Sequence, residues 1–88
     1  MSWTIHLSPE ADEQLSRVPR DHQGTIAGAI DRMREDPFQG NVQPLKGKEW
    51  KGRYRKVAGR YRLIFIPLHS EQIVEISQII LRTEKTYR

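Results

Sequence analysis

Cysteine is absent from this 88-residue sequence, so disulfides and thiolate metal sites are excluded. No stretch approaches the run of about 18 apolar residues that a membrane span requires. The opening MSWTIHLSPEADEQL also lacks the basic start and apolar run of a secretion signal. Internal repeats, low-complexity segments, glycine-rich phosphate loops, serine triads and zinc patterns are missing too. We therefore expect one cytoplasmic domain over residues 1–88, with no cofactor and no membrane association.

Negative charge is scarce in one part of the chain. Between residues 46 and 62 a single acid, Glu49, stands against eight basic residues, whereas the rest of the chain has seven basic and ten acidic residues. The eight are Lys46, Lys48, Lys51, Arg53, Arg55, Lys56, Arg60 and Arg62. The net charge is only +4, yet the pI is near 9.8. Charge clustered in this way indicates an anionic partner, either nucleic acid or an acidic protein.

The basic stretch alternates as strands do, because successive side chains of a strand point to opposite faces. The first strand places Tyr54, Lys56 and Ala58 on one face, and Arg53, Arg55 and Val57 on the other. Gly59 supplies the tight reversal. The second strand, 60–66, places Tyr61, Leu63 and Phe65 on one face, and Arg60, Arg62, Ile64 and Ile66 on the other. A basic hairpin is often only a solvated sheet face. Charge of one sign interleaved with aromatic rings favours phosphate neutralisation and base stacking instead.

The remaining elements follow from periodicity. We expect a strand at Trp3–Leu7, a helix from Pro9 to Val18 capped by Ser8, and a second helix from Asp21 to Asp36. A loop should cover 38–44, Pro67 should end a strand, and 73–81 should form a buried central strand. The fold class predicted is α+β, in the order β-α-α-β-β-β. Two N-terminal helices would pack on a mainly antiparallel four-stranded sheet.

Several short motifs occur in a specific order. They are Glu35-Asp36-Pro37, Pro44-Leu45-Lys46-Gly47, the stretch Tyr54 to Phe65, Arg82 at the end of the last strand, and Tyr87 after it. Over nearly its whole length the chain thereby resembles the RelE/ParE superfamily of type II toxin–antitoxin toxins. The resemblance implies a fold like that of microbial ribonucleases, a cognate antitoxin as partner, and a hetero-oligomer with that antitoxin.

The superfamily carries two activities on one fold, so the site has to decide between them. RelE-like members cut mRNA in the ribosomal A site, whereas ParE-like members block DNA gyrase. The resemblance implies catalytic roles for Arg53, Arg55, Arg62, Arg82 and Tyr87. RNA-binding roles are expected for Lys46, Lys48, Lys51, Lys56, Arg60 and Lys85, and no metal is expected. We favour a metal-independent, ribosome-dependent mRNA endoribonuclease. The alternative is a ParE-like gyrase inhibitor or a toxin relative without catalysis.

The candidate site departs from the family pattern at two positions. Val57 stands where many relatives have a basic residue, and Leu81 where many have a histidine. The guanidinium group is poorly suited to act as a general base, because it holds its proton too tightly, so we expect Arg62 and Arg82 to stabilise charge on the phosphoryl oxygens. The three histidines are scattered and are expected to be ordinary ones. Trp3 and Trp50 are predicted to pack within the protein rather than to stack on bases.

Overall fold

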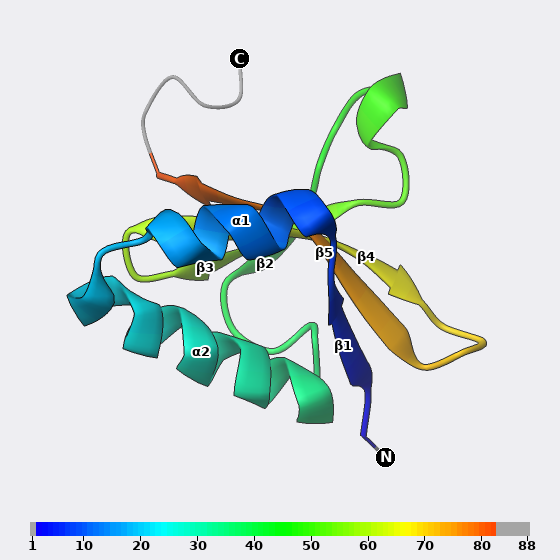
Figure 1. The fold of residues 1–88 in the computed structure, drawn as a ribbon. Helices are drawn as coiled ribbons and strands as arrows, with labels where there is room; N and C mark the ends of the chain where they lie inside the picture. The colour runs from blue at the N-terminus through cyan, green and yellow to red at the C-terminus, as the bar shows by residue number, and fades with distance from the viewer. Residues whose placement is uncertain (1, 83–88) are drawn as a thin grey trace.

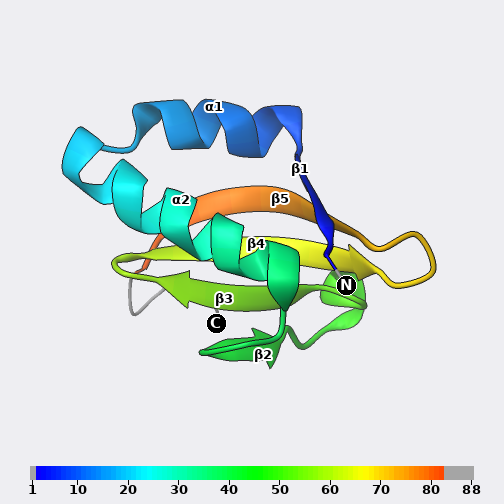
Figure 2. The same ribbon diagram turned by 90° about the horizontal axis from the view of Figure 1, so that it is seen from below.

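The computed structural model describes residues 2–82, which form a five-stranded sheet with two helices on one side (Figures 1 and 2). The predicted α+β class is confirmed. Along the chain the elements are β1 (Thr4–Leu7), α1 (Pro9–Arg17), α2 (Arg20–Glu35), β2 (Val42–Pro44), a 3-10 turn (Lys48–Trp50), β3 (Tyr54–Ala58), β4 (Tyr61–Leu68) and β5 (Ile73–Leu81). Neither helix in this part of the chain is long and apolar enough to span a bilayer.

The strands lie in the order β1-β5-β4-β3-β2. β1 is parallel to β5, and each of the other neighbouring pairs is antiparallel. β5 therefore has a partner on both sides, as its continuous apolar sequence predicted. The N-terminal strand consequently pairs with the last strand of the described chain, and the basic hairpin of β3 and β4 continues the sheet towards β2.

The sheet has one strand more than predicted. Val42–Pro44, expected to be part of a loop, forms the edge strand β2 and pairs with β3 from Lys56 to Tyr54. Three residues are too few to show an alternating pattern, and Pro44 cannot donate to a ladder, so nothing local marks this segment as a strand. Pairing with the edge of β3 makes it one.

The expected strand end at Pro67 is also wrong, because this proline lies inside β4. β3 pairs with β4 only as far as Phe65, whereas β5 pairs with it as far as Leu68. At Pro67 the strand therefore has a neighbour on one side only. A missing N–H group is tolerated at such an edge position.

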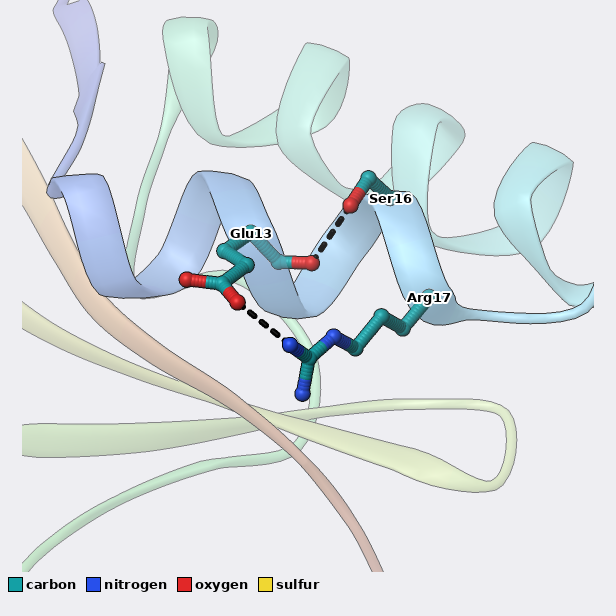
Figure 3. Close-up of polar contacts among 3 residues, drawn as sticks. All are labelled: Glu13, Ser16 and Arg17. Atoms are coloured by element: carbon teal, nitrogen blue, oxygen red, sulfur yellow. Dashed lines mark hydrogen bonds and ion pairs between the residues drawn. The ribbon is translucent and has the colours of Figure 1, made fainter.

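α1 begins as the sequence predicted. The Ser8 side chain accepts a hydrogen bond from the backbone N–H of Ala11 at 3.1 Å, and Pro9 takes the first helical position. On the solvent side Arg17 pairs with the Glu13 carboxylate at 2.5 Å, and the Ser16 hydroxyl donates to the Glu13 carbonyl at 2.6 Å (Figure 3). Exposed pairs of this kind contribute little to stability. What holds the helix in place is its apolar side.

The core lies between the helices and one face of the sheet. α2 contributes Ile26, Ala29, Ile30 and Met33, α1 and its end contribute Ala11 and Val18, and the sheet contributes Ala58, Leu63, Phe65, Val74, Ile76 and Ile79. Ile26, Met33, Leu63 and Phe65 have no exposed surface. Because both helices share this one cluster with the sheet, the opposite face of the sheet has no helix over it.

An extra residue in β5 interrupts the ladder between the two central strands. Phe65 pairs with Ile76 and Ile64 with Gln78, so Ser77 is opposite no residue of β4 in the ladder register. The Ser77 hydroxyl still donates to the Ile64 carbonyl of β4 at 3.2 Å, whereas two backbone groups near the bulge bond to α1 and its cap. The Ser8 hydroxyl donates to the Ser77 carbonyl at 2.9 Å, and the Ile79 N–H donates to the Gln14 side-chain oxygen at 2.6 Å. α1 is thus fixed to the centre of the sheet.

We expect Gly24→Ala to stabilise the protein. Gly24 is exposed in the interior of α2, and a β-carbon built there would have no heavy atom within 4 Å. Alanine should add about 1 kcal/mol to the free energy of unfolding and raise the Tm by about 4–8 °C in a domain of this size.

The control is Gly59→Ala at the β3–β4 turn. There φ is +60°, and a β-carbon would lie 3.1 Å from the Thr25 side chain. This variant should be destabilised. Thermal unfolding followed by circular dichroism measures both variants, and a lower Tm for Gly24→Ala would contradict the account of α2.

Candidate nucleic-acid interface

Cross-strand pairing assigns the basic side chains of the hairpin to two different faces, since directly opposed residues share a face. Leu63 lies in the core, and its partners Lys56 and Ile79 are therefore on the helix side. The neighbouring pairs, Arg55 with Ile64 and Arg62 with both Val57 and Ile80, lie on the face that no helix covers. Arg55 and Arg62 are thus together on this uncovered face.

Arg55 is held in place by the edge strand. Its guanidinium donates a hydrogen bond to the side-chain oxygen of Gln43 in β2, which is opposite Arg55 in the register. Both Arg55 and Arg62 are half-buried, and Ile64, which pairs with Arg55 across the strands, is fully buried. Gln43 is a functional neighbour that sequence reasoning missed, because its strand is not recognisable from the sequence.

Arg82 extends the same face beyond the end of β5. Its backbone N–H donates to the Arg60 carbonyl at 2.7 Å, so the pairing with the β4 side continues one step past Leu81. Arg82 stands two positions after Ile80, which is opposite Arg62. Strand alternation therefore places Arg82 on the side of Arg62. Gly59, Arg60, Leu81 and Arg82 line an open hollow of about 420 Å³ at this end of the sheet.

The predicted lysines Lys46, Lys48 and Lys51 lie on a projecting loop, here named the arm (residues 45–53). A backbone hydrogen bond of 3.0 Å from the Leu45 N–H to the Arg53 carbonyl closes its base. All three lysines are exposed. In Figure 1 the arm, in green, stands on the side of the sheet opposite α2, which is the side of the uncovered face.

Arg53 is engaged within the arm. Its guanidinium donates to the Glu49 carbonyl at 2.9 Å, and its guanidinium carbon lies 5.9 Å from the centre of the Trp50 ring. Trp50 is half-buried and packs against this arginine. As predicted, the ring packs within the protein, but it does so in the arm and not in the hydrophobic core. Arg53 is therefore not arranged like Arg55 and Arg62, whose side chains project from paired strands.

Lys56, for which an RNA-binding role was expected, does not lie on the basic surface. It shares the helix-side face with Leu63, is only 5% exposed, and donates from Nζ to the Gln39 carbonyl at 2.6 Å. Burial lowers the pKa of Lys56, the Arg32 guanidinium lowers it further, and the Asp36 carboxylate acts in the opposite direction. The lysine anchors the chain between α2 and β2.

Two predicted residues, Tyr87 and Lys85, lie outside the described residues. Within 2–82 the histidines make no site: His69 stacks on Phe38 at a centroid distance of 5.8 Å, and His22 lies 5.8 Å from Tyr61. The same part of the chain holds no group of three His, Asp or Glu side chains placed to bind a metal. The arrangement is therefore one of fixed cations: Arg55, Arg62 and Arg82 on one face, and the lysines on the arm.

Solved structures share this architecture. The chain has the fold of the RelE-like toxins. The Mycobacterium tuberculosis RelBE2 toxin–antitoxin complex contains a chain that matches with a TM-score of 0.82 and 19% identity, over 93% of this chain and 100% of that one. A chain of the archaeal RelE–RelB complex from Pyrococcus horikoshii matches with a TM-score of 0.79 and 19% identity, over 96% of this chain and 99% of that one. No family model matches the sequence, and neither does any curated protein.

A third match is a chain named both YoeB and ParE. The YoeB/ParE toxin from Agrobacterium tumefaciens matches with a TM-score of 0.76 and 19% identity, over 91% of this chain and 99% of that one. The RelE-like fold recognised from the motifs is therefore confirmed over nearly the whole chain. Because fold and activity are separable at such identities, the activity has to be argued from the residues of the site.

The lowered pKa of Lys56 predicts a pH effect on stability. Between the lowered pKa of the folded protein and the ordinary value of about 10.4, the unfolded chain binds more protons at this position than the folded protein does. The free energy of unfolding should therefore rise with pH in that window, relative to a Lys56→Met variant that does not titrate there.

Urea unfolding of both proteins at a series of pH values from neutral upwards provides the measurement. The difference between wild type and Lys56→Met should shift in favour of the wild type as the pH rises. The other titrating groups are common to both proteins and cancel in the difference. A difference that stays constant with pH would show that Lys56 is solvated in the folded protein.

Proposed function

We propose that this protein is the toxin of a type II toxin–antitoxin pair and acts in the cytoplasm as a metal-independent endoribonuclease on mRNA in the ribosomal A site. The observation that carries the proposal is the placement of Arg55 and Arg62 on the uncovered face, with Arg82 at the adjoining end of β5. The RelE-like fold supports it, since the similar chains are toxins from toxin–antitoxin complexes.

The chemistry assigned to the face is phosphoryl transfer within RNA. The ribose 2′-oxygen attacks the adjacent phosphorus and loses its proton, the bond to the 5′-oxygen breaks, and that oxygen leaves as a protonated hydroxyl. The products are a 2′,3′-cyclic phosphate and a 5′-hydroxyl end. Negative charge grows on the phosphoryl oxygens during the attack, and the fixed guanidinium groups of Arg62 and Arg82 stabilise it. Arg55, held by Gln43, binds a neighbouring phosphate.

One observation favours a second candidate function, the ParE-like inhibition of DNA gyrase. Val57 lies directly opposite Arg62, so the position beside the central arginine is apolar, where many relatives of the ribonuclease branch have a basic residue. A face with fewer charges beside Arg62 suits binding better than catalysis. Cleavage assays separate the two functions.

Arg62→Ala should reduce cleavage of ribosome-bound message by about a hundredfold or more, as the loss of one preorganised donor does elsewhere. Arg82→Ala should behave similarly. Cleavage by the wild type should persist in EDTA and leave a 2′,3′-cyclic phosphate or the 3′-phosphate formed from it. Primer extension on translating ribosomes locates the cuts, and end-group analysis identifies the products.

The matched control is Arg20→Ala, which removes an exposed arginine from the start of α2 on the other side of the molecule. Its cleavage rate should equal that of the wild type. Circular dichroism should show that all three variants remain folded. If the wild type leaves message intact on translating ribosomes but inhibits DNA supercoiling by gyrase, the ribonuclease assignment is wrong and the second function replaces it.

The proposed partner is a small antitoxin protein, acidic or amphipathic, that covers the uncovered face. A concentrated basic surface binds nucleic acid indiscriminately unless it is masked. When the protein is co-expressed with the product of the adjacent gene, the two should purify together. Arg55→Glu combined with Arg62→Glu should weaken the complex by at least about tenfold, because like charges then oppose each other.

Isothermal titration calorimetry with the purified partner gives the dissociation constants. Arg20→Glu combined with Arg34→Glu changes the net charge equally on the helices and serves as the control. If the helix variant weakens the complex while the face variant does not, the antitoxin binds on the helix side.

A further inference from the structure

The arm concentrates positive charge away from the strands that carry Arg55 and Arg62. Its nine residues hold Lys46, Lys48, Lys51 and Arg53 against Glu49, a net charge of +3 in a chain of net charge +4. It projects from the sheet on the side of the uncovered face (Figure 1). The three lysines are exposed, and the ion pairs described in residues 2–82 do not include them.

The arm is also built to hold one shape. The Trp50 N–H donates to the Gly47 carbonyl at 3.2 Å, and the Arg53 N–H donates to the Trp50 carbonyl at 2.9 Å. Gly47 and Gly52 flank the 3-10 turn with φ values of +105° and +79°, a conformation that other residues rarely adopt. The Arg53 guanidinium then joins the Glu49 carbonyl to the Trp50 ring. Charges on a preorganised loop lose little entropy on binding.

The chemistry of the arm fits a phosphate backbone better than a protein surface. A stable protein interface needs apolar anchors at its centre. The large apolar side chains that are exposed in residues 2–82 are Phe38, Leu68 and Leu81, and none lies in the arm. What the arm offers is flexible ammonium groups on a rigid loop. These suit the regularly spaced phosphates of an RNA helix, which are contacted without reading the sequence.

We propose that the arm is a separate attachment element that grips the sugar–phosphate backbone of base-paired RNA, while Arg55, Arg62 and Arg82 act on the strand that is cut. The inference rests on the proposed function only in taking RNA as the ligand. Arg53 is then a positioning residue of the arm, since its guanidinium is used to hold Trp50 and the Glu49 carbonyl. Attachment and cleavage belong to different parts of the surface.

The test measures binding to a fully paired RNA hairpin, labelled with fluorescein, over a series of salt concentrations. EDTA is present and every protein carries Arg62→Ala, so binding is followed without cleavage. The variant Lys46→Gln/Lys48→Gln/Lys51→Gln should bind more weakly. The slope of log K against log salt should fall by about 2 to 3, because each lost phosphate contact removes about 0.7–0.9 from it.

The matched control is Arg17→Gln/Arg20→Gln/Arg34→Gln, which removes the same charge from exposed positions on the helices. Its slope should change by less than about 1. A second variant, Arg53→Lys, keeps the charge but loses the planar group that stacks on Trp50. It should weaken binding with little change in slope, and the fluorescence change of Trp50 on binding, identified by comparison with Trp50→Phe, should shrink.

Equal slopes for the arm and helix variants would overturn the proposal, because net charge alone would then explain binding. Polyglutamate serves as a model of an acidic protein. If the arm variant loses binding to polyglutamate but still binds the RNA hairpin as the unchanged arm does, the proposal is overturned as well, since the arm would then contact an acidic protein. The proposed ribonuclease activity can fail independently of this proposal. If hairpin binding depends on the arm but message on ribosomes stays intact, the arm is still an RNA-attachment element and the ribonuclease assignment is wrong.

Discussion

The unpaired residue in β5 controls which side chains of the central strands face the helices. Ile76 and Ile79 are three positions apart, so regular alternation would send them to opposite faces, yet both lie in the core. Ser77 takes up the odd position, and the strand after it resumes the register that puts Ile80 opposite Arg62. A slip of one residue would exchange the two faces. Ser8 and Gln14 oppose such a slip, because they bond to the Ser77 carbonyl and the Ile79 N–H, backbone groups at the bulge and just after it.

The same register places a lysine on the helix side of the sheet and two arginines on the opposite face. Lys56, on the core side, reaches a backbone carbonyl and has a lowered pKa, since a lysine can respond to burial by losing its proton. The half-buried cations on the other side, Arg55 and Arg62, are both arginines, whose planar guanidinium matches the geometry of a phosphate. The guanidinium groups are therefore found where a phosphate would be bound, and the titratable amine where the fold itself needs a hydrogen bond.

Most of the architecture could be predicted because local signals agree with it: Ser8 and Pro9 start α1, and alternation over 53–66 places Arg55 and Arg62 away from Leu63. The same alternation put Lys56 with Tyr54 and Ala58, which are core-side residues, so its burial was visible in the pattern but was outweighed by its charge. β2 and the strand position of Pro67 could not be predicted, because they depend on how far neighbouring strands extend. The hydrogen bond between Gln43 and Arg55 could not be predicted either, because it requires β2. The contact between Arg53 and Trp50 requires the folded arm.

The parallel pairing of β1 with β5 joins the two ends of the described chain, with Thr4 beside Ile73 and Leu7 beside Ile76. Ser8 and Ser77, which are bonded to each other, are 69 positions apart in sequence. A chain emerging from the ribosome in N-to-C order therefore lacks the strand that joins β1 to β4 until residue 81 has been made. Before then β4 has no partner on its β5 side, the bulge does not exist, and Arg62 is not fixed on a face. The sheet of residues 2–82 is therefore completed only after β5 has been synthesised, and the basic surface is assembled no earlier than that.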